Sequence, residues 1–220
     1  MAYLVYIMHT SAPSATTRVY QHLKRAILER IHAEGALLSE AEIAATVGVS
    51  RTPVREALLR LESEGLVALY PKREVLVRPV SAAEIEDVID ARRLVEVHAA
   101  QRAWARREQL VGELDPLLAA MRAARDDADV PGLMAADRAF HEAVVAGGGN
   151  AILAELYQRL RDRQMRIGIT AMRLEPQRMD RAVADHAELV DALRGTDLAH
   201  WTGLVERHIG TAALRMRPAR

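Results

Sequence analysis

The sequence of 220 residues contains no cysteine and few aromatic residues, with one phenylalanine and two tryptophans. The missing cysteine excludes disulfide bonds and any metal site that is built on thiolates. With so few aromatic side chains, the core must consist of alanine, leucine, valine and methionine, a composition that favours helices. The apolar run near the N-terminus is too short to cross a membrane. We therefore expect no membrane partner and a cytoplasmic location.

An excess of either charge is also missing, because 30 basic residues balance 30 acidic ones. The overall charge therefore does not by itself indicate a nucleic-acid partner. Half of the residues are hydrophobic, which is enough for a well-formed core. The length suits two domains, and we expect an N-terminal extension over 1–15, a first domain over 16–80 and a second over 81–220.

The first domain has the pattern of a winged helix-turn-helix. Apolar residues recur every four positions over about 16–33, which predicts an amphipathic helix. A second, short helix follows Ser39, and a third begins after Ser50, which we expect to cap it, and ends at Gly65. Two β-prone runs, LVALY and VLVRPV, surround PKRE and predict a hairpin. Three helices with a tight turn before the third, followed by a hairpin, are typical of DNA-binding domains.

The third helix would enter the major groove with its N-terminal residues facing the base edges. Arg51 and Arg55 are four residues apart and can reach the same groove, one to a guanine and one to a base or phosphate. Either arginine taken alone would more often be a solvated surface residue. The helix N-terminus can bind phosphate, with the candidate contacts Ser50, Arg51, Thr52, Pro53 and Arg55. We expect the buried side of this helix to carry Leu58, Leu59 and Leu61.

The stretch LSEAEIAATVGVSRTPVREALLRLESEGLV resembles the DNA-binding signature of the GntR family of bacterial transcription regulators. SRTPVREAL is the most specific part of this resemblance. It implies that Arg51, Thr52 and Arg55 contact DNA and that the partner is double-stranded DNA. Arg25 on the first helix is a further candidate for a phosphate contact.

The wing departs from the pattern of this family, which commonly has a glycine near the tip. This sequence has PKRE there, ending in Glu74, which puts the usual insertion into the minor groove in doubt. Lys72 and Arg73 could still contact phosphate.

The sequence of the second domain predicts helices almost throughout, so the protein is expected to be mainly α. Proline, glycine or asparagine residues separate the helices at about 131, 147–150, 176 and 195. We expect a bundle of about six helices, with spans near 82–107, 109–127, 131–146, 150–172, 177–195 and 197–216.

Four polar side chains fall on the apolar faces of these helices. Asp137 and His141 are four residues apart in DRAFHEAV and share the apolar side of one helix, while His186 and His208 lie in the apolar stripes of two later helices. A buried polar group costs several kcal/mol unless it has a partner. A single inward histidine more often binds a backbone carbonyl than a metal, but four such groups together suit zinc, nickel, cobalt, manganese or iron.

An all-helical domain behind a GntR-type winged helix resembles the FadR subfamily, whose helical part is called an FCD domain. The metal-binding branch of that group has an Asp-x-x-x-His motif on one helix and single histidines on two later helices. This correspondence implies a divalent metal, with zinc as the first candidate, bound by Asp137, His141, His186 and His208.

Open positions on such a metal would suit a small carboxylate or sugar-acid effector. Arg92 matches an arginine that often contacts the effector in this family, and it shares a stripe with Val88 and Val95. It could equally form an ion pair with Glu96, and Arg93 replaces it if the helix phase is shifted by one residue.

An enzyme is not expected, because HEAVV lacks the second histidine of the zinc-protease motif HExxH at Val145. The sequence also offers no evident general base, oxyanion hole or glycine-rich phosphate loop. We expect a homodimeric repressor that binds a pseudo-palindromic operator and is controlled by the effector at the metal. The alternatives are a regulator whose metal is structural or is itself the signal, a helical domain that only dimerises, and a metal-dependent hydrolase.

Overall fold

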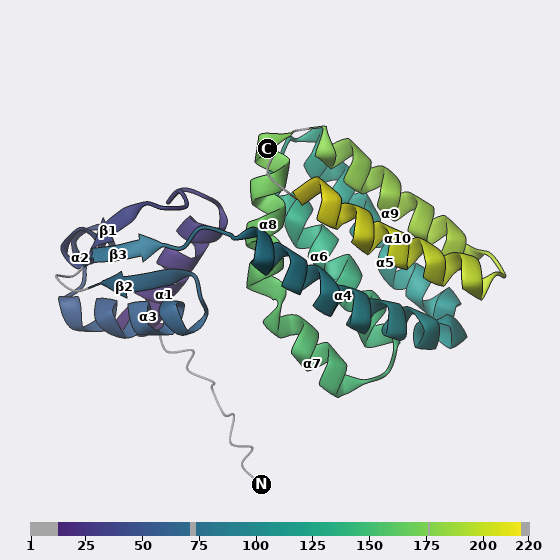
Figure 1. Ribbon diagram of the computed structural model, residues 1–220, viewed down its shortest axis with the longest axis horizontal. Coiled ribbons are helices and arrows are strands. Elements are labelled where there is room, and N and C mark those ends of the chain that lie inside the picture. The colour runs from purple at the N-terminus through teal and green to yellow at the C-terminus, as the bar shows by residue number, and fades with distance from the viewer. Residues whose placement is uncertain (1–12, 71–73, 176, 217–220) are drawn as a thin grey trace, which may run out of the picture. The chain divides into compact units, whose positions relative to one another are not determined.

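The structure is a computed structural model that describes residues 13–70, 74–175 and 177–216. The described chain divides into two compact units, each with its own core. The first contains the residues up to Ile27 and 31–79, and the second contains 28–30 and the residues from Val80 onward. Figure 1 shows one mixed unit with a small sheet and one unit made of helices.

The first unit is a winged helix-turn-helix with a three-stranded antiparallel sheet in the order β1-β3-β2. The expected hairpin is present, with Leu69 opposite Val75. The strand β1 is additional, and it pairs with the other edge of β3. The elements of this unit are α1 (Ala15–Leu28), β1 (Leu37–Ser39), α2 (Glu40–Val47), α3 (Arg51–Ser63), β2 (Val67–Tyr70) and β3 (Glu74–Val77).

Two expectations about this unit are wrong. The first helix ends at Leu28, not near 33, because Arg30 takes a left-handed backbone with φ 58° and the N–H of His32 donates to the carbonyl of Ala26. Ile31, the last residue of the expected stripe, is therefore 66% exposed. Leu59 is 59% exposed, since it lies about 100° around α3 from the buried Leu58.

The ends of α2 and α3 follow the sequence signals with one exception. The side chain of Ser39 accepts a hydrogen bond from the N–H of Glu42, and Gly48 ends α2 in the left-handed conformation that glycine adopts most easily. Ser50 occupies the position before α3, but its side chain makes no capping hydrogen bond there. The expected cap is therefore wrong, and Gly65, with φ 75°, follows the end of α3.

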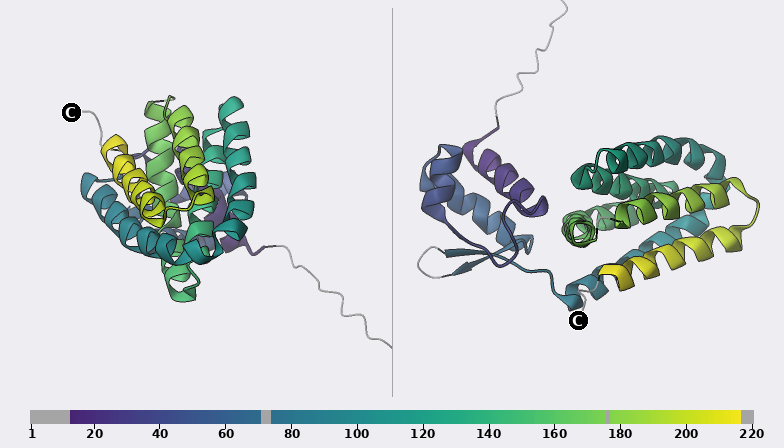
Figure 2. Two further views of the ribbon diagram at one scale, coloured as in Figure 1. Left: turned by 90° about the vertical axis from the view of Figure 1, so that its right-hand side faces the viewer. Right: turned by 90° about the horizontal axis from the view of Figure 1, so that it is seen from above.

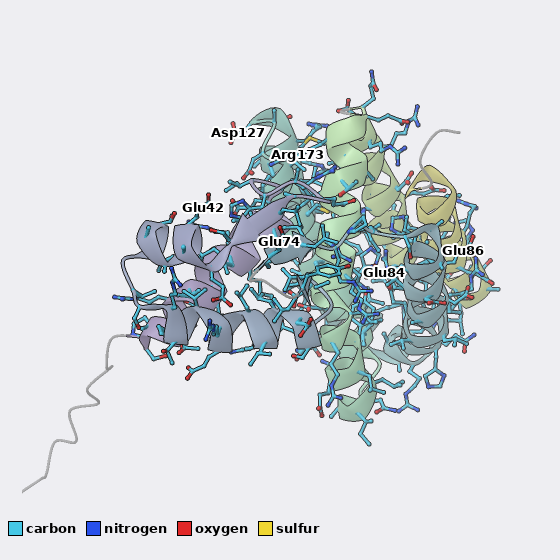
Figure 3. All side chains as sticks on the ribbon, turned by 60° about the vertical axis from the view of Figure 1, so that its left-hand side comes forward. Glu42, Glu74, Glu84, Glu86, Asp127 and Arg173 are labelled. Atoms are coloured by element: carbon cyan, nitrogen blue, oxygen red, sulfur yellow. The ribbon has the colours of Figure 1, made fainter. Side chains whose placement is uncertain are left out.

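The second unit is a bundle in which α6 packs against α4, α5, α8 and α9. Both views of Figure 2 show α10 beside α4 and α9. Glu84 of α4, labelled in Figure 3, accepts hydrogen bonds from Arg166 of α8 at 2.9 Å. The helices of this unit are α4 (Ala82–Ala103), a 3-10 turn (Trp104–Arg106), α5 (Arg107–Asp126), α6 (Val130–Gly147), α7 (Ala151–Arg159), α8 (Arg161–Leu174), α9 (Arg178–Arg194) and α10 (Leu198–Met216).

The span expected as one helix over 150–172 is divided into α7 and α8. At Leu160 the backbone makes a tight turn, in which the N–H of Leu160 donates to the carbonyl of Tyr157, three residues back. Among the described residues, no helix combines the length and hydrophobicity that crossing a membrane requires.

Candidate functional site

The exposed start of α3 is the candidate DNA-binding surface of the first unit. Val54, Leu58 and Leu61 bury one side of this helix in the core, which leaves Arg51 and Thr52 exposed at its first turn. The first N–H groups of a helix have no partner within it and carry partial positive charge. This end of α3 can therefore bind phosphate while its side chains reach base edges.

Arg55 is also exposed on α3, but its Nε donates to the carboxylate of Glu40 at the start of α2, 3.0 Å away. This ion pair holds the guanidinium across the turn between the two helices. Exposed pairs of this kind contribute little to stability, so Arg55 can exchange Glu40 for a phosphate or a base at low cost.

The remaining candidate DNA contacts differ in how far they are exposed. Arg25 on α1 and Ser50 are exposed, and Pro53 is half-buried. Glu74 lies at the start of β3, opposite Tyr70 and Ser39, and is labelled in Figure 3. Lys72 and Arg73 lie outside the described residues.

In the second unit, three histidines from α6, α9 and α10 meet in the interior. The Nε2 atoms of His186 and His208 each lie 3.2 Å from Nε2 of His141. His141 and His186 are buried, and His208 is largely buried. Residues that are far apart in the sequence thus direct equivalent ring nitrogens at one point.

The other ring nitrogens determine where the protons lie. Nδ1 of His186 is 2.7 Å from the carbonyl oxygen of Ala182, so it must donate its proton there. Nδ1 of His141 is 2.6 Å from Oε2 of Glu96, and a carboxylate likewise accepts. When both rings are neutral, each directs the lone pair of Nε2 into the cluster, where the two lone pairs repel unless a cation lies between them.

Asp137 lies beside the three histidines and is close to one of them. Its Oδ1 lies 3.3 Å from Nε2 of His186, one turn before His141 on α6. Four ligands around a zinc ion, each about 2.0–2.1 Å from it, would be separated by about 3.3 Å in a tetrahedron. The separations of 3.2 and 3.3 Å in the cluster agree with that geometry.

Burial favours the neutral form of two of the three histidines. It lowers the pKa of His186 to about 4, partly offset by the nearby Asp137 carboxylate. Burial also lowers the pKa of His208 well below its usual range, and the neighbouring His186 and His141 rings lower it further. Neutral imidazoles are the form that binds a metal.

Behind the cluster, Glu96 of α4 is fully buried, accepts two hydrogen bonds and faces one histidine nitrogen. Its Oε1 accepts from Nε of Arg92 at 2.7 Å and from the hydroxyl of Tyr157 at 2.6 Å, while Oε2 faces His141. Burial alone would raise the pKa of Glu96, but Arg92 and His141 outweigh it and hold that pKa far below its usual range. Arg92 and Glu96 therefore form an ion pair in the interior.

A cavity of about 80 Å³ adjoins the cluster. One face of α8 lines it at positions 164, 167, 168, 171 and 172, which follow the helical repeat. Most of the surface that lines it is apolar, and its polar lining residues are Arg92, Asp137, Arg138, Gln164, Arg178, Arg181, Asp185, His186 and His208. A small polar molecule in this cavity would lie next to the histidines.

Each of the two units matches a known protein family. Residues 15–77 match the family of bacterial regulatory proteins called the gntR family, and 87–211 match the FCD domain. This chain belongs to the GntR family. It is 36% identical over 185 residues to an uncharacterised helix-turn-helix regulator from Streptomyces ambofaciens, covering 82% of this chain and 75% of that protein. A similar regulator from Agrobacterium vitis is 36% identical over 140 residues, which are 62% and 82% of the two chains.

A solved structure is similar in fold to this GntR-family chain. The putative GntR regulator from Rhodococcus sp. RHA1 has a TM-score of 0.76 and 25% identity, with coverage of 93% of this chain and 98% of that one. Members of the family are transcription regulators and not enzymes, as the sequence indicated. The winged helix-turn-helix and the helical domain behind it are therefore confirmed, while membership of the FadR subfamily stays a prediction.

Of the four residues that the sequence proposed as metal ligands, the geometry brings the three histidines together, and Asp137 lies close to one of them, His186. Arg92 lies beside them, paired with Glu96 and lining the cavity, so both of its expected roles remain compatible with its position. Sequence reasoning missed the contacts of Glu96 with His141 and Tyr157. A signal was present, because Glu96 follows Arg92 by four residues on the face of α4 that carries Ala99 and Ala103.

Proposed function

We propose that this GntR-family regulator is a homodimeric repressor controlled by a small carboxylate effector, which binds at a divalent metal in the helical domain. The observation that carries the proposal is the meeting of three Nε2 atoms, two of them with lone pairs fixed inward by Ala182 and Glu96. Converging imidazole nitrogens with inward lone pairs match the needs of a cation.

His141, His186, His208 and Asp137 would hold the ion. Three imidazoles and a carboxylate suit zinc first, and also nickel, cobalt, manganese or iron. The ion would supply open coordination positions for the oxygen atoms of an effector. Glu96 would keep the His141 ring oriented with Nε2 toward the ion.

The effector class is supported by the cavity and by relatives. The adjoining cavity contains arginine side chains suited to a carboxylate. A relative from Bacillus licheniformis, 29% identical, is a repressor of a gluconate operon, and one from Paenarthrobacter nicotinovorans, 31% identical, is a probable repressor of a D-xylose operon. Gluconate is a sugar acid, the class that the sequence also favoured.

Operator binding would use α3 from each subunit in successive major grooves of a pseudo-palindromic site. The exposed Leu94 of α4 and the exposed Ile152 and Leu156 of α7 offer an apolar surface for the second copy, because these two helices are in contact. Effector binding would change the spacing of the two α3 helices and lower the affinity for DNA.

A thermal-shift panel tests the proposal. Metal-loaded and EDTA-stripped protein are each heated with small carboxylates and sugar acids. We expect a ligand that raises the melting temperature by several degrees only in the loaded protein. If stripping lowers the melting temperature and no acid raises it, the metal is structural or is itself the signal. If the protein neither retains nor responds to any divalent metal, the metal-dependent effector site is refuted.

A further inference from the structure

The ion pair between α2 and α3 uses only one nitrogen of the arginine. Nε of Arg55 donates to both carboxylate oxygens of Glu40, at 3.0 and 3.2 Å, and its two Nη groups make no hydrogen bond within the described part of the chain. The side chain of Glu40 is only 12% exposed, whereas that of Arg55 is 51% exposed. A packed carboxylate thus holds one end of the guanidinium, and the edge formed by the two Nη groups remains available.

This Nη edge is the part of an arginine that matches a guanine. Its N–H groups can bind O6 and N7 of one guanine together, which is the commonest specific contact in the major groove. Arg55 lies one turn after Arg51 on the exposed side of α3. Because the contact with Glu40 involves Nε alone, Arg55 can bind a guanine while the ion pair stays intact.

A phosphate group would meet a less favourable situation at Arg55. Arginine binds phosphate best through two parallel N–H groups, and Glu40 already occupies Nε. Its negative charge also lies 3.0 Å from that nitrogen and repels a second anion, but not the neutral edge of a base. With Glu40 in place, a base is therefore the better partner for this arginine.

We propose that Glu40 is a positioning residue for sequence reading, because it holds Nε of Arg55, leaves the Nη edge for a guanine and disfavours a phosphate contact. This inference rests on the proposed DNA contact of α3, and it assigns Arg55 to a base and not to the backbone. Without Glu40, the arginine would bind phosphate readily, and phosphate contacts carry no sequence information.

Base-pair substitutions in the operator test this role. An operator fragment is selected from a random library, each G·C pair of one half-site is replaced by A·T, and affinities are measured by fluorescence anisotropy. We expect one pair at which the wild type discriminates by at least about tenfold, as a bidentate arginine provides.

Glu40→Ala should reduce this discrimination to less than about threefold, because Arg55 is no longer held for the base. It should bind the substituted operator at least as tightly as the wild type does, since a charge that repels phosphate is gone. The slope of log affinity against log salt concentration should steepen by about one, as Arg55 gains a phosphate contact.

Glu42→Ala is the matched control, because Glu42 lies in the same first turn of α2 and its carboxylate has no arginine partner among the residues described. Glu42 is labelled in Figure 3, and its replacement should leave the discrimination unchanged. Arg55→Lys keeps the charge but not the two-pronged edge, so it should lose the same discrimination with α2 unaltered. Thermal melts establish that each variant is folded.

The outcomes separate this inference from the proposed function. If Glu40→Ala weakens binding to every sequence equally and keeps the discrimination, Glu40 only supports the fold, and the inference is refuted while the DNA contact of α3 stands. The same holds if Arg55→Lys keeps the discrimination, since Arg55 then reads no base. If neither Arg51→Ala nor Arg55→Ala weakens binding to the operator, the proposed DNA contact is itself refuted.

Discussion

At the scale of single residues, the buried polar network of the helical domain depends on Glu96. Its carboxylate accepts hydrogen bonds from Arg92 and Tyr157 and faces Nδ1 of His141. Breaking a buried ion pair by removing one member leaves the other charge without compensation, which is more costly than losing a neutral hydrogen bond. The carboxylate therefore matters both to stability and to the orientation of the histidine.

Glu96→Gln is expected to lower the free energy of unfolding by about 3 kcal/mol, because Arg92 remains charged in the interior. Tyr157→Phe, which removes one hydroxyl and no charge, should cost about 1 kcal/mol. Urea denaturation of the two variants checks this difference. Competition with a zinc chelator should show at least about tenfold weaker zinc binding for Glu96→Gln. Equal losses of stability in both variants would contradict the assigned role of the charge.

At the scale of elements, α3 and α10 are expected to carry separate tasks. Arg51 lies at the exposed start of α3, and His208 belongs to the histidine cluster on α10. Arg51→Ala should weaken binding of an operator fragment by about 1–3 kcal/mol, measured by fluorescence anisotropy on DNA selected from a random library. His208→Ala without effector should bind that DNA nearly as well as the wild type.

Arg60→Ala is the control for this prediction, because it removes an exposed arginine from the last turn of the same helix. It should weaken binding much less than Arg51→Ala does. Equal effects of the Arg51 and His208 variants would refute the division between DNA contact and effector response.

The elements were predictable where a local signal marks them. Gly48 and Gly65 mark the ends of α2 and α3, and both take the left-handed conformation. The break at Leu160 has no glycine or proline, so no local pattern reveals it. The strand β1 is only three residues long and depends on its pairing with β3, which lies far away in the sequence.

At the scale of the whole molecule, the buried histidines make stability depend on pH. The pKa of His186 falls from 6.5 to about 4 on folding, so between these values the unfolded chain binds more protons. Stability therefore decreases as the pH falls from 6.5 to 4, by about 3 kcal/mol for this group. The low pKa of Glu96 in the folded protein acts in the same direction, but only below about pH 4.5.

Urea denaturation of EDTA-stripped protein at several pH values between 4 and 7 checks this prediction. His186→Leu should flatten the dependence above pH 4.5, whereas His200→Ala, which removes an exposed histidine, should leave it unchanged. Stability that rises as the pH falls through this range would contradict the assignment of a neutral, buried His186.

The candidate site was predictable in its members but not in its geometry. Helical spacing alone placed Asp137 and His141 on one face and directed His186 and His208 inward. That these helices bring the ring nitrogens within 3.2 Å depends on the packing of α6, α9 and α10, which periodicity does not encode.

The three buried partners of Glu96 also limit how this sequence can change during evolution. Its donors belong to α4, α6 and α7, so a substitution of Glu96 alone strands a buried cation and a buried hydroxyl together. A neutral replacement becomes tolerable only when Arg92 changes as well. Among relatives that share this domain, positions 92, 96 and 157 should therefore vary as a group.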